Sequence, residues 1–128
     1  MAKKVLQVIE TAYRGTLEEQ DDTVLWLTHA MSDAGLRTDV LLRGNATNYP
    51  VKAQDASGLE FGGRKQTQPP RIADDVARLI ERGVNVYVVT EDLDRRGIQM
   101  PDLIRGIKPV GSAELPKLLG GYDQIWHW

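Results

Sequence analysis

Two glutamates, Glu10 and Glu91, each come at the end of a run of apolar residues that is typical of a buried strand. Carboxylates that lie close together alter one another's proton affinity and can then act as general acid and general base. Glu10 and Glu91 can form such a pair if their two strands are close in the folded chain. The alternative is that both are ordinary solvated loop residues, which is the commoner situation for a glutamate.

Other polar side chains follow similar apolar runs. Ligands of open α/β sheets bind beyond the carboxyl ends of the strands, so residues at these positions are candidates for a binding site. An enzyme that acts on a small anionic substrate would take its carboxylate, arginine and tyrosine groups from this set. The candidate ligand-binding residues are Glu10, Thr11, Tyr13, Arg14, Arg43, Asn45, Thr90 and Glu91, and Gly111 and Ser112 follow the fourth run.

The chain has no cysteine and only two histidines, His29 and His127. Without a sulfur nucleophile, thiol catalysis, persulfide transfer, disulfides and thiolate metal sites are excluded. The two histidines are far apart in the sequence and do not predict a metal site. We expect His29 to be a surface or subunit-contact residue, and we assign no catalytic residue and no metal ligand.

The glycine motifs of nucleotide-binding proteins are incomplete in this chain. Gly58 and Gly63 have the spacing of a P-loop, but Arg64 and Lys65 stand where that motif needs lysine and a hydroxyl residue. The segment "ETAYRGT" after the first apolar run has one glycine rather than three. We therefore expect no nucleotide cofactor, although the start of a helix can still bind a small anion.

The composition is that of one folded domain, which we assign to residues 1–128, because 41% of the residues are hydrophobic and 27% are charged. The net charge of −2 gives no electrostatic reason to expect binding to nucleic acid or to an anionic membrane. The first apolar run is too short for a signal peptide, and no run reaches the ~18 residues of a membrane-spanning helix. The expected location is the cytoplasm.

Short apolar runs alternate with segments of helical periodicity. A capping box at Thr16 and Glu19 predicts the start of the first helix, and Pro69 and Pro70 predict the start of a second that Gly83 ends. This alternation predicts a three-layer α/β/α sandwich with a five-stranded parallel sheet, of the flavodoxin-like or Rossmann-like class. The expected strands are residues 4–9, 38–42, 84–90, 107–110 and 123–128, and the other expected helices are residues 17–34, 101–105 and 112–119.

Two features lie outside this pattern. Residues 43–68 contain four glycines and one proline with little apolar periodicity, which is typical of a binding lid, a subunit contact or a disordered loop. In the last strand, Trp126 and Trp128 should point to one face, and Ile125 and His127 to the other. The two tryptophans can belong to the core or to a subunit interface, where this residue is enriched.

Three segments, "VNVYVVTEDLDRRGI", "ELPKLL" and "YDQIWHW", resemble the DsrE/DsrF-like (DsrEFH-like) family of small sulfur-relay proteins. The resemblance extends over the whole chain in length and element order, and Arg95, Arg96 and Gly97 match the family's Arg-Gly motif. It implies a three-layer sandwich with a five-stranded parallel sheet. It also implies a homo-oligomer, either a trimer or a hexamer.

The catalytic members of that family carry a cysteine on or just after the third strand, which accepts and passes on persulfide sulfur. Tyr87 or Val89 stands at that position, depending on whether the count starts at Asn85 or at Gly97. The resemblance therefore implies a non-catalytic oligomeric binding or assembly protein, linked to intracellular sulfur transfer or redox metabolism and to a protein partner there. The alternatives are the small-molecule enzyme described above and a flavin or nucleotide carrier of the flavodoxin type.

Overall fold

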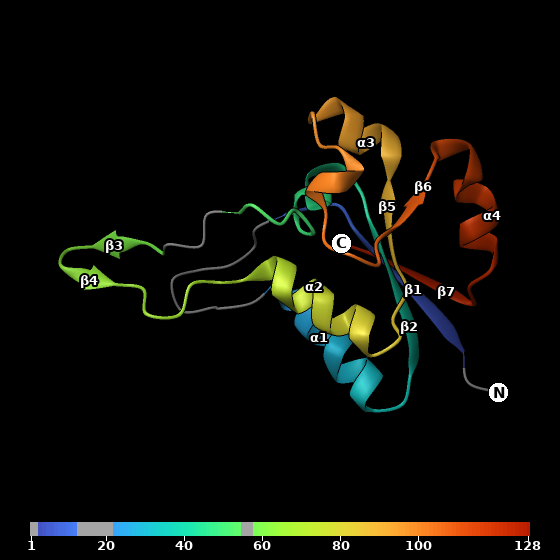
Figure 1. Ribbon diagram of the computed structural model, residues 1–128. Coiled ribbons are helices and arrows are strands. Elements are labelled where there is room, and N and C mark those ends of the chain that lie inside the picture. The colour runs from blue at the N-terminus through green and yellow to red at the C-terminus, as the bar shows by residue number, and fades with distance from the viewer. Residues whose placement is uncertain (1–2, 13–21, 55–57) are drawn as a thin grey trace.

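The centre of the molecule is a sheet of five parallel strands in the order β6-β5-β2-β1-β7 (Figure 1). The computed structural model describes residues 3–12, 22–54 and 58–128. The predicted five-stranded parallel sheet is confirmed, and its inner strands are largely buried because both faces are covered. The strands are β1 (Lys4–Ile9), β2 (Arg37–Leu42), β5 (Val86–Val89), β6 (Lys108–Val110) and β7 (Gln124–His127).

Helices lie on both faces of the sheet, which confirms the predicted three layers. The helices α1 (Thr23–Asp33) and α2 (Ile72–Glu81) cover one face, and α4 (Leu115–Gly120) covers the other (Figure 1). Val88 of β5 belongs to the larger core cluster under α1 and α2. Leu41 of β2 belongs to a smaller cluster under α4. Among the described residues, two helices and the larger core cluster cover one face, and one short helix covers the other.

Helix α1 begins later than the sequence predicts. The predicted capping box at Thr16 and Glu19 lies outside the described residues, but Asp22 has an extended backbone and is the N-cap of α1. Its carboxylate accepts the backbone N–H groups of Val24 at 2.9 Å and Leu25 at 3.1 Å, which satisfies two amides that have no partner within the helix. The prediction of one helix over residues 17–34 is therefore wrong at its start.

The segment after β5 also differs from the prediction. Thr90, predicted as the last residue of that strand, begins the helix α3 (Thr90–Arg95). The helix predicted over residues 101–105 is instead a short 3-10 turn, η2 (Met100–Asp102). Buried Leu93 packs α3 onto the larger core cluster, and this tertiary contact stabilises a helix at this position.

The helix predicted from Ser112 begins three residues later. A 3-10 turn, η3 (Ser112–Glu114), comes first, and α4 follows with Pro116 in its first turn. Proline is tolerated there because the first-turn N–H groups have no partner within the helix. The Ser112 side chain is consequently not a helix cap.

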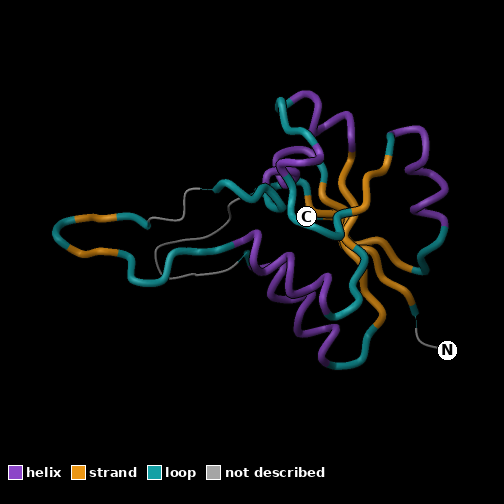
Figure 2. The backbone as a smooth tube through the Cα atoms, in the orientation of Figure 1, coloured by secondary structure: helices purple, strands orange, loops and turns teal. Residues whose placement is uncertain are grey.

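The connection over residues 43–68 contains two structured pieces. The first is a 3-10 turn, η1 (Gly44–Asn48), which is followed by the fully buried Tyr49. The second is a hairpin of two very short strands, β3 (Glu60–Phe61) and β4 (Arg64–Lys65), that extends away from the rest of the molecule (Figures 1 and 2). Of the three alternatives for this region, disorder does not describe these two pieces, and the choice between a binding lid and a subunit contact stays a prediction.

None of the helices among the described residues is long and apolar enough to cross a lipid bilayer.

Candidate functional site at the carboxyl ends of the strands

The sheet order keeps the two candidate acid–base residues apart. Strand β2 lies between β1 and β5, so Glu10 and Glu91 follow strands that are two spacings, roughly 10 Å, apart. Each carboxylate has a different hydrogen-bond partner. The hypothesis that Glu10 and Glu91 face each other is therefore wrong.

Glu10 pairs with the last strand. Its Oε2 atom lies 2.7 Å from Nε2 of His127, and both side chains are about half exposed. The backbone N–H groups of Glu10 and Thr11 donate to the backbone oxygen of Trp128 at 3.0 and 3.4 Å. These contacts fasten the end of β1 to the end of β7.

Trp128 is held by a buried amide. Its indole N–H donates to Oε1 of Gln7 at 2.7 Å, and the Gln7 amide nitrogen donates to Sδ of Met31 at 3.2 Å. Gln7 is fully buried, whereas Trp126 and Trp128 remain 36% and 40% exposed. The two tryptophans are therefore only partly buried in this subunit.

Glu91 is bonded across the strand ends to Ser112. Its Oε2 atom accepts the Ser112 backbone N–H at 2.8 Å and the Ser112 hydroxyl at 2.6 Å. These bonds, the hydroxyl first and the backbone amide second, lower the pKa of Glu91 because both stabilise the anion. Thr90 adds a longer contact from its hydroxyl at 3.4 Å. Glu91 therefore favours its charged form more strongly than an ordinary glutamate.

A second group of contacts joins the end of β2 to α3. The Gly44 N–H donates to Oδ2 of Asp92 at 2.8 Å, and Arg96 donates to Oδ1 of Asn45 at 2.9 Å and to the backbone oxygen of Asp92 at 3.1 Å. Gly44 has a left-handed φ of 56°, and a Cβ added there would come within 3.1 Å of Cγ of Glu10. Glycine is therefore required both by the backbone conformation and by the close approach of Glu10.

Arg43 adds a polar atom that is not satisfied. Its Nε atom is buried and has no hydrogen-bond partner among the described residues, while its backbone N–H donates to the Ile9 oxygen at 3.0 Å. The candidate residues Tyr13 and Arg14 lie outside the described residues. Of the predicted set, the structure brings Thr90 and Glu91 together with Ser112, and Asn45 together with Arg96.

The two positions expected for the family cysteine hold a valine, Val89, and a tyrosine, Tyr87. Val89 is the last residue of β5, is 2% exposed and packs in the smaller core cluster. Tyr87 is half-buried and packs against the same cluster from the α4 side. Within the described residues, no group of three or more histidine, aspartate or glutamate side chains could hold a metal ion.

Comparisons with known proteins identify the fold of this chain but not its function. No protein-family model and no curated protein matches the chain. Among solved structures, the chain is similar to the YchN protein from E. coli, with a TM-score of 0.73 and 20% sequence identity over 98% of this chain and 99% of that one. The chain has the DsrE-like fold.

A second solved structure has the same type of fold. This is MTH1491, a protein of unknown function from Methanobacterium thermoautotrophicum, with a TM-score of 0.58 and 18% identity over 98% of this chain and 99% of that one. At this level of identity the similarity concerns the fold alone. The DsrE-like fold expected from the sequence is therefore confirmed, and function has to be argued from the residues.

Sequence reasoning missed two contacts at the carboxyl ends. The Glu10–His127 pair depends on the pairing of β1 with β7, and no local pattern indicates which strands are neighbours. Asp92 was missed because an acidic residue in the first turn of a helix is usually solvated. The feature of the sequence that could have indicated the burial of Asp92 is its apolar neighbour Leu93, because the two residues lie on the side of α3 that faces the core.

Proposed function

We propose that this chain is a non-catalytic DsrE-like protein that acts as a homo-oligomeric binding or assembly subunit, linked to intracellular sulfur transfer or redox metabolism. The observation that carries this proposal is strand β5, where half-buried Tyr87 and buried Val89 occupy the two positions that the family resemblance allows for a sulfur-carrying cysteine. A persulfide needs a thiol, and the chain has none. A role in sulfur metabolism would then consist of binding a sulfur-carrying partner protein.

The contacts of Glu91 also favour a non-catalytic protein. A carboxylate whose anion is stabilised by two hydrogen bonds from Ser112 is a weaker base than an ordinary glutamate. Glu10, the second carboxylate of the alternative enzyme, lies on the far side of β2 and pairs with His127. The enzyme hypothesis therefore has less support than the binding or assembly hypothesis.

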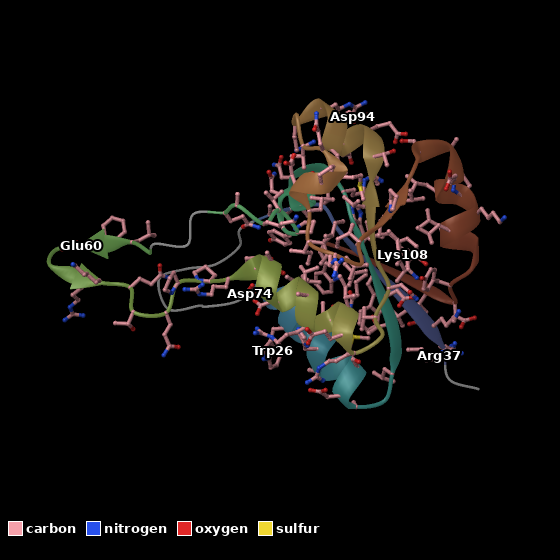
Figure 3. The ribbon with its side chains drawn as sticks, in the orientation of Figure 1. Trp26, Arg37, Glu60, Asp74, Asp94 and Lys108 are labelled. Atoms are coloured by element: carbon pink, nitrogen blue, oxygen red, sulfur yellow. The ribbon has the colours of Figure 1, made fainter. Side chains whose placement is uncertain are left out.

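Exposed apolar side chains support the oligomer. Leu59 and Phe61 on the hairpin are 55% and 62% exposed, and the hairpin side chains extend away from the rest of the molecule, as the labelled Glu60 shows (Figure 3). A two-stranded hairpin is marginally stable by itself in water, and a neighbouring subunit would supply an apolar surface for it to pack on. We propose that this hairpin contacts a second copy of the chain in a trimer or hexamer.

Light scattering with size-exclusion chromatography tests the oligomer. We expect the unmodified protein to have three or six times the mass of one chain. The double variant Leu59→Ser/Phe61→Ser should shift to a smaller mass because it removes the apolar contact, whereas Lys65→Ser, on the same hairpin, should not. One chain mass for the unmodified protein at micromolar concentration would refute the oligomer.

Mass spectrometry tests the absence of sulfur chemistry. After incubation with a persulfide donor and removal of free reagent, the mass of the chain should be unchanged. A stable covalent adduct of one or more sulfur atoms would overturn the proposal. A cysteine-containing DsrE-like protein treated in parallel serves as the positive control.

A further inference from the structure

A cavity of about 510 Å³ lies between α4 and the strands β5 and β6. We call it the α4 pocket and define it by Lys4, Tyr87, Pro109, Lys117, Leu118 and Tyr122, which are among the residues that line it. Its size is within the range of small-molecule binding sites. It shares none of the residues of the carboxyl-end hydrogen bonds described above, and Tyr87, one of the two positions for the family cysteine, lies in its lining.

Tyr122, which lines the α4 pocket, is held in place by a hydrogen bond from its hydroxyl group. The Tyr122 hydroxyl donates to Oδ2 of Asp39 at 2.6 Å, and Asp39 also accepts the backbone N–H of Asn85 at 2.9 Å and its side-chain nitrogen at 3.2 Å. Burial, followed by the hydrogen bond to Asp39, raises the pKa of Tyr122 far above its ordinary value, so this hydroxyl remains a donor. A fixed aromatic ring loses little conformational entropy when a ligand packs on it.

The pocket is aromatic and apolar as well as open to solvent. Tyr87 is half-buried beside Tyr122, and Pro109 and Leu118 contribute hydrocarbon surface. Flat rings pack favourably on tyrosine side chains in offset or edge-to-face arrangements. The lining therefore suits a small molecule that contains a ring.

The charged side chains that line the pocket include two lysines and one glutamate. Nζ of Lys4 lies 5.9 Å from the ring centroid of Tyr122, and Nζ of Lys108 lies 5.9 Å from that of Tyr87. Lys117 lines the pocket, and one carboxylate, Glu114, lies beside it. None of the three lysines forms an ion pair with a described residue. Among the residues that line the pocket, the two ammonium groups of Lys4 and Lys117 outnumber the single carboxylate of Glu114, which favours an anionic ligand.

We propose that the α4 pocket binds a small molecule with a flat ring and one anionic group, with the ring against Tyr87 and Tyr122 and the anionic group near Lys4 and Lys117. The anionic group is a carboxylate or a phosphate, since both accept hydrogen bonds from ammonium groups. This inference goes beyond the proposed function, because it assigns a site and a ligand class that an enzyme and a non-catalytic protein could equally have.

Ligand-observed fluorine NMR tests the pocket at any oligomer size. The probes are fluorobenzoate, fluorophenyl phosphate and the neutral fluorobenzyl alcohol. We expect at least one anionic probe to show saturable line broadening, with the neutral probe binding at least fivefold more weakly. Equal binding of neutral and anionic probes, or no saturable broadening, would overturn the proposal. The stronger of the two anionic probes distinguishes a carboxylate from a phosphate ligand.

A double variant locates the binding. Lys4→Gln/Lys117→Gln should weaken the anionic probe by about fivefold, the effect expected for two partly exposed ion pairs. Lys52→Gln, at an exposed lysine outside the pocket, should leave the affinity unchanged. Unchanged binding by the double variant, with a circular dichroism spectrum like that of the unmodified protein, would refute this site.

Discussion

At the scale of single residues, the Glu91 carboxylate is the most strongly organised charge at the carboxyl ends of the strands. It accepts both the backbone N–H and the hydroxyl of Ser112. The lowered pKa of Glu91 means that the native protein binds this proton less tightly than an unfolded chain. Its contribution to stability is therefore present above the ordinary value of 4.5 and is lost as the pH falls through the native pKa.

The variant Ser112→Ala should raise the pKa of Glu91 toward 4.5, because it removes the hydroxyl that contributes most to the shift and leaves the weaker contributions of the backbone N–H groups and the Thr90 hydroxyl. The measurement is a carboxyl-detected NMR titration. Ser32→Ala, a serine on α1, is the control and should leave the titration of Glu91 unchanged. An unaltered Glu91 titration in Ser112→Ala would contradict the hydrogen-bond assignment.

Asp22 is the second residue with a clear energetic role. Its carboxylate caps α1 and accepts the hydroxyl of buried Tyr49 at 2.5 Å, while Asp22 itself is 1% exposed. Asp22→Ala should lower the free energy of unfolding by about 2 kcal/mol, since it removes a helix cap and a buried hydrogen-bond acceptor together. Chemical denaturation provides the measurement.

Asp22→Asn is the matched variant for this position. It keeps a side-chain oxygen for the helix amides, and its nitrogen can donate to the Tyr49 hydroxyl. We expect about half the loss that Asp22→Ala produces. Equal losses in the two variants would show that capping and the Tyr49 contact contribute little.

At the scale of elements, the alternation of apolar runs and helical periodicity was sufficient to predict five parallel strands between helices. Residues 4–9 were predicted and found as a strand, and every position after Lys4 in it is buried. The start of α1 and the place of α3 were predicted wrongly. The sequence has several acidic residues before α1 and does not single out Asp22 as the cap. It also does not indicate that Leu93 of α3 packs in the larger core cluster.

Gly106 offers a test of packing between elements. It has a φ of 90°, and a Cβ added there would lie 2.7 Å from Cγ2 of Ile80 on α2. Gly106→Ala should lower the free energy of unfolding by about 2 kcal/mol or more, from backbone strain plus this clash. Gly35→Ala is the control, because Gly35 has a similar φ of 84° with no atom within 4 Å of an added Cβ.

The difference between the two glycine variants isolates the clash. Gly35→Ala should cost about 1 kcal/mol, from the left-handed backbone alone. Thermal or chemical denaturation of both variants, under identical conditions, gives the comparison. A Gly106→Ala variant that is no less stable than Gly35→Ala would mean that Ile80 moves aside freely.

At the scale of the whole molecule, the sheet order explains why the candidate site could be predicted only in part. Polar residues after each strand were expected to share one edge, and Glu91 and Ser112 do so because β5 and β6 are neighbours. Glu10 and Glu91 do not meet because β2 lies between their strands. Which strands are neighbours depends on how the entire chain packs, and a local sequence motif does not indicate this.

The proposed oligomer predicts a stability that depends on protein concentration. Subunits that bind only in the native state stabilise it by mass action, so a tenfold higher concentration should raise the Tm by roughly 2–5 °C. Differential scanning calorimetry at two concentrations is the measurement. The Leu59→Ser/Phe61→Ser variant should lose this dependence, and a Tm independent of concentration in the unmodified protein would oppose the oligomer.

The burial of Tyr49 divides the long connection between β2 and α2 into two parts with different tolerance of change in length. Before Tyr49, the chain is fixed to the body by a fully buried ring and by the carboxylate of Asp22. Beyond it, the turn at Gly62 and Gly63 has open space around both residues. Insertions, deletions and grafted peptides can therefore be accommodated at this turn without disturbing the sheet, whereas the same changes before Tyr49 would pull a core residue out of place.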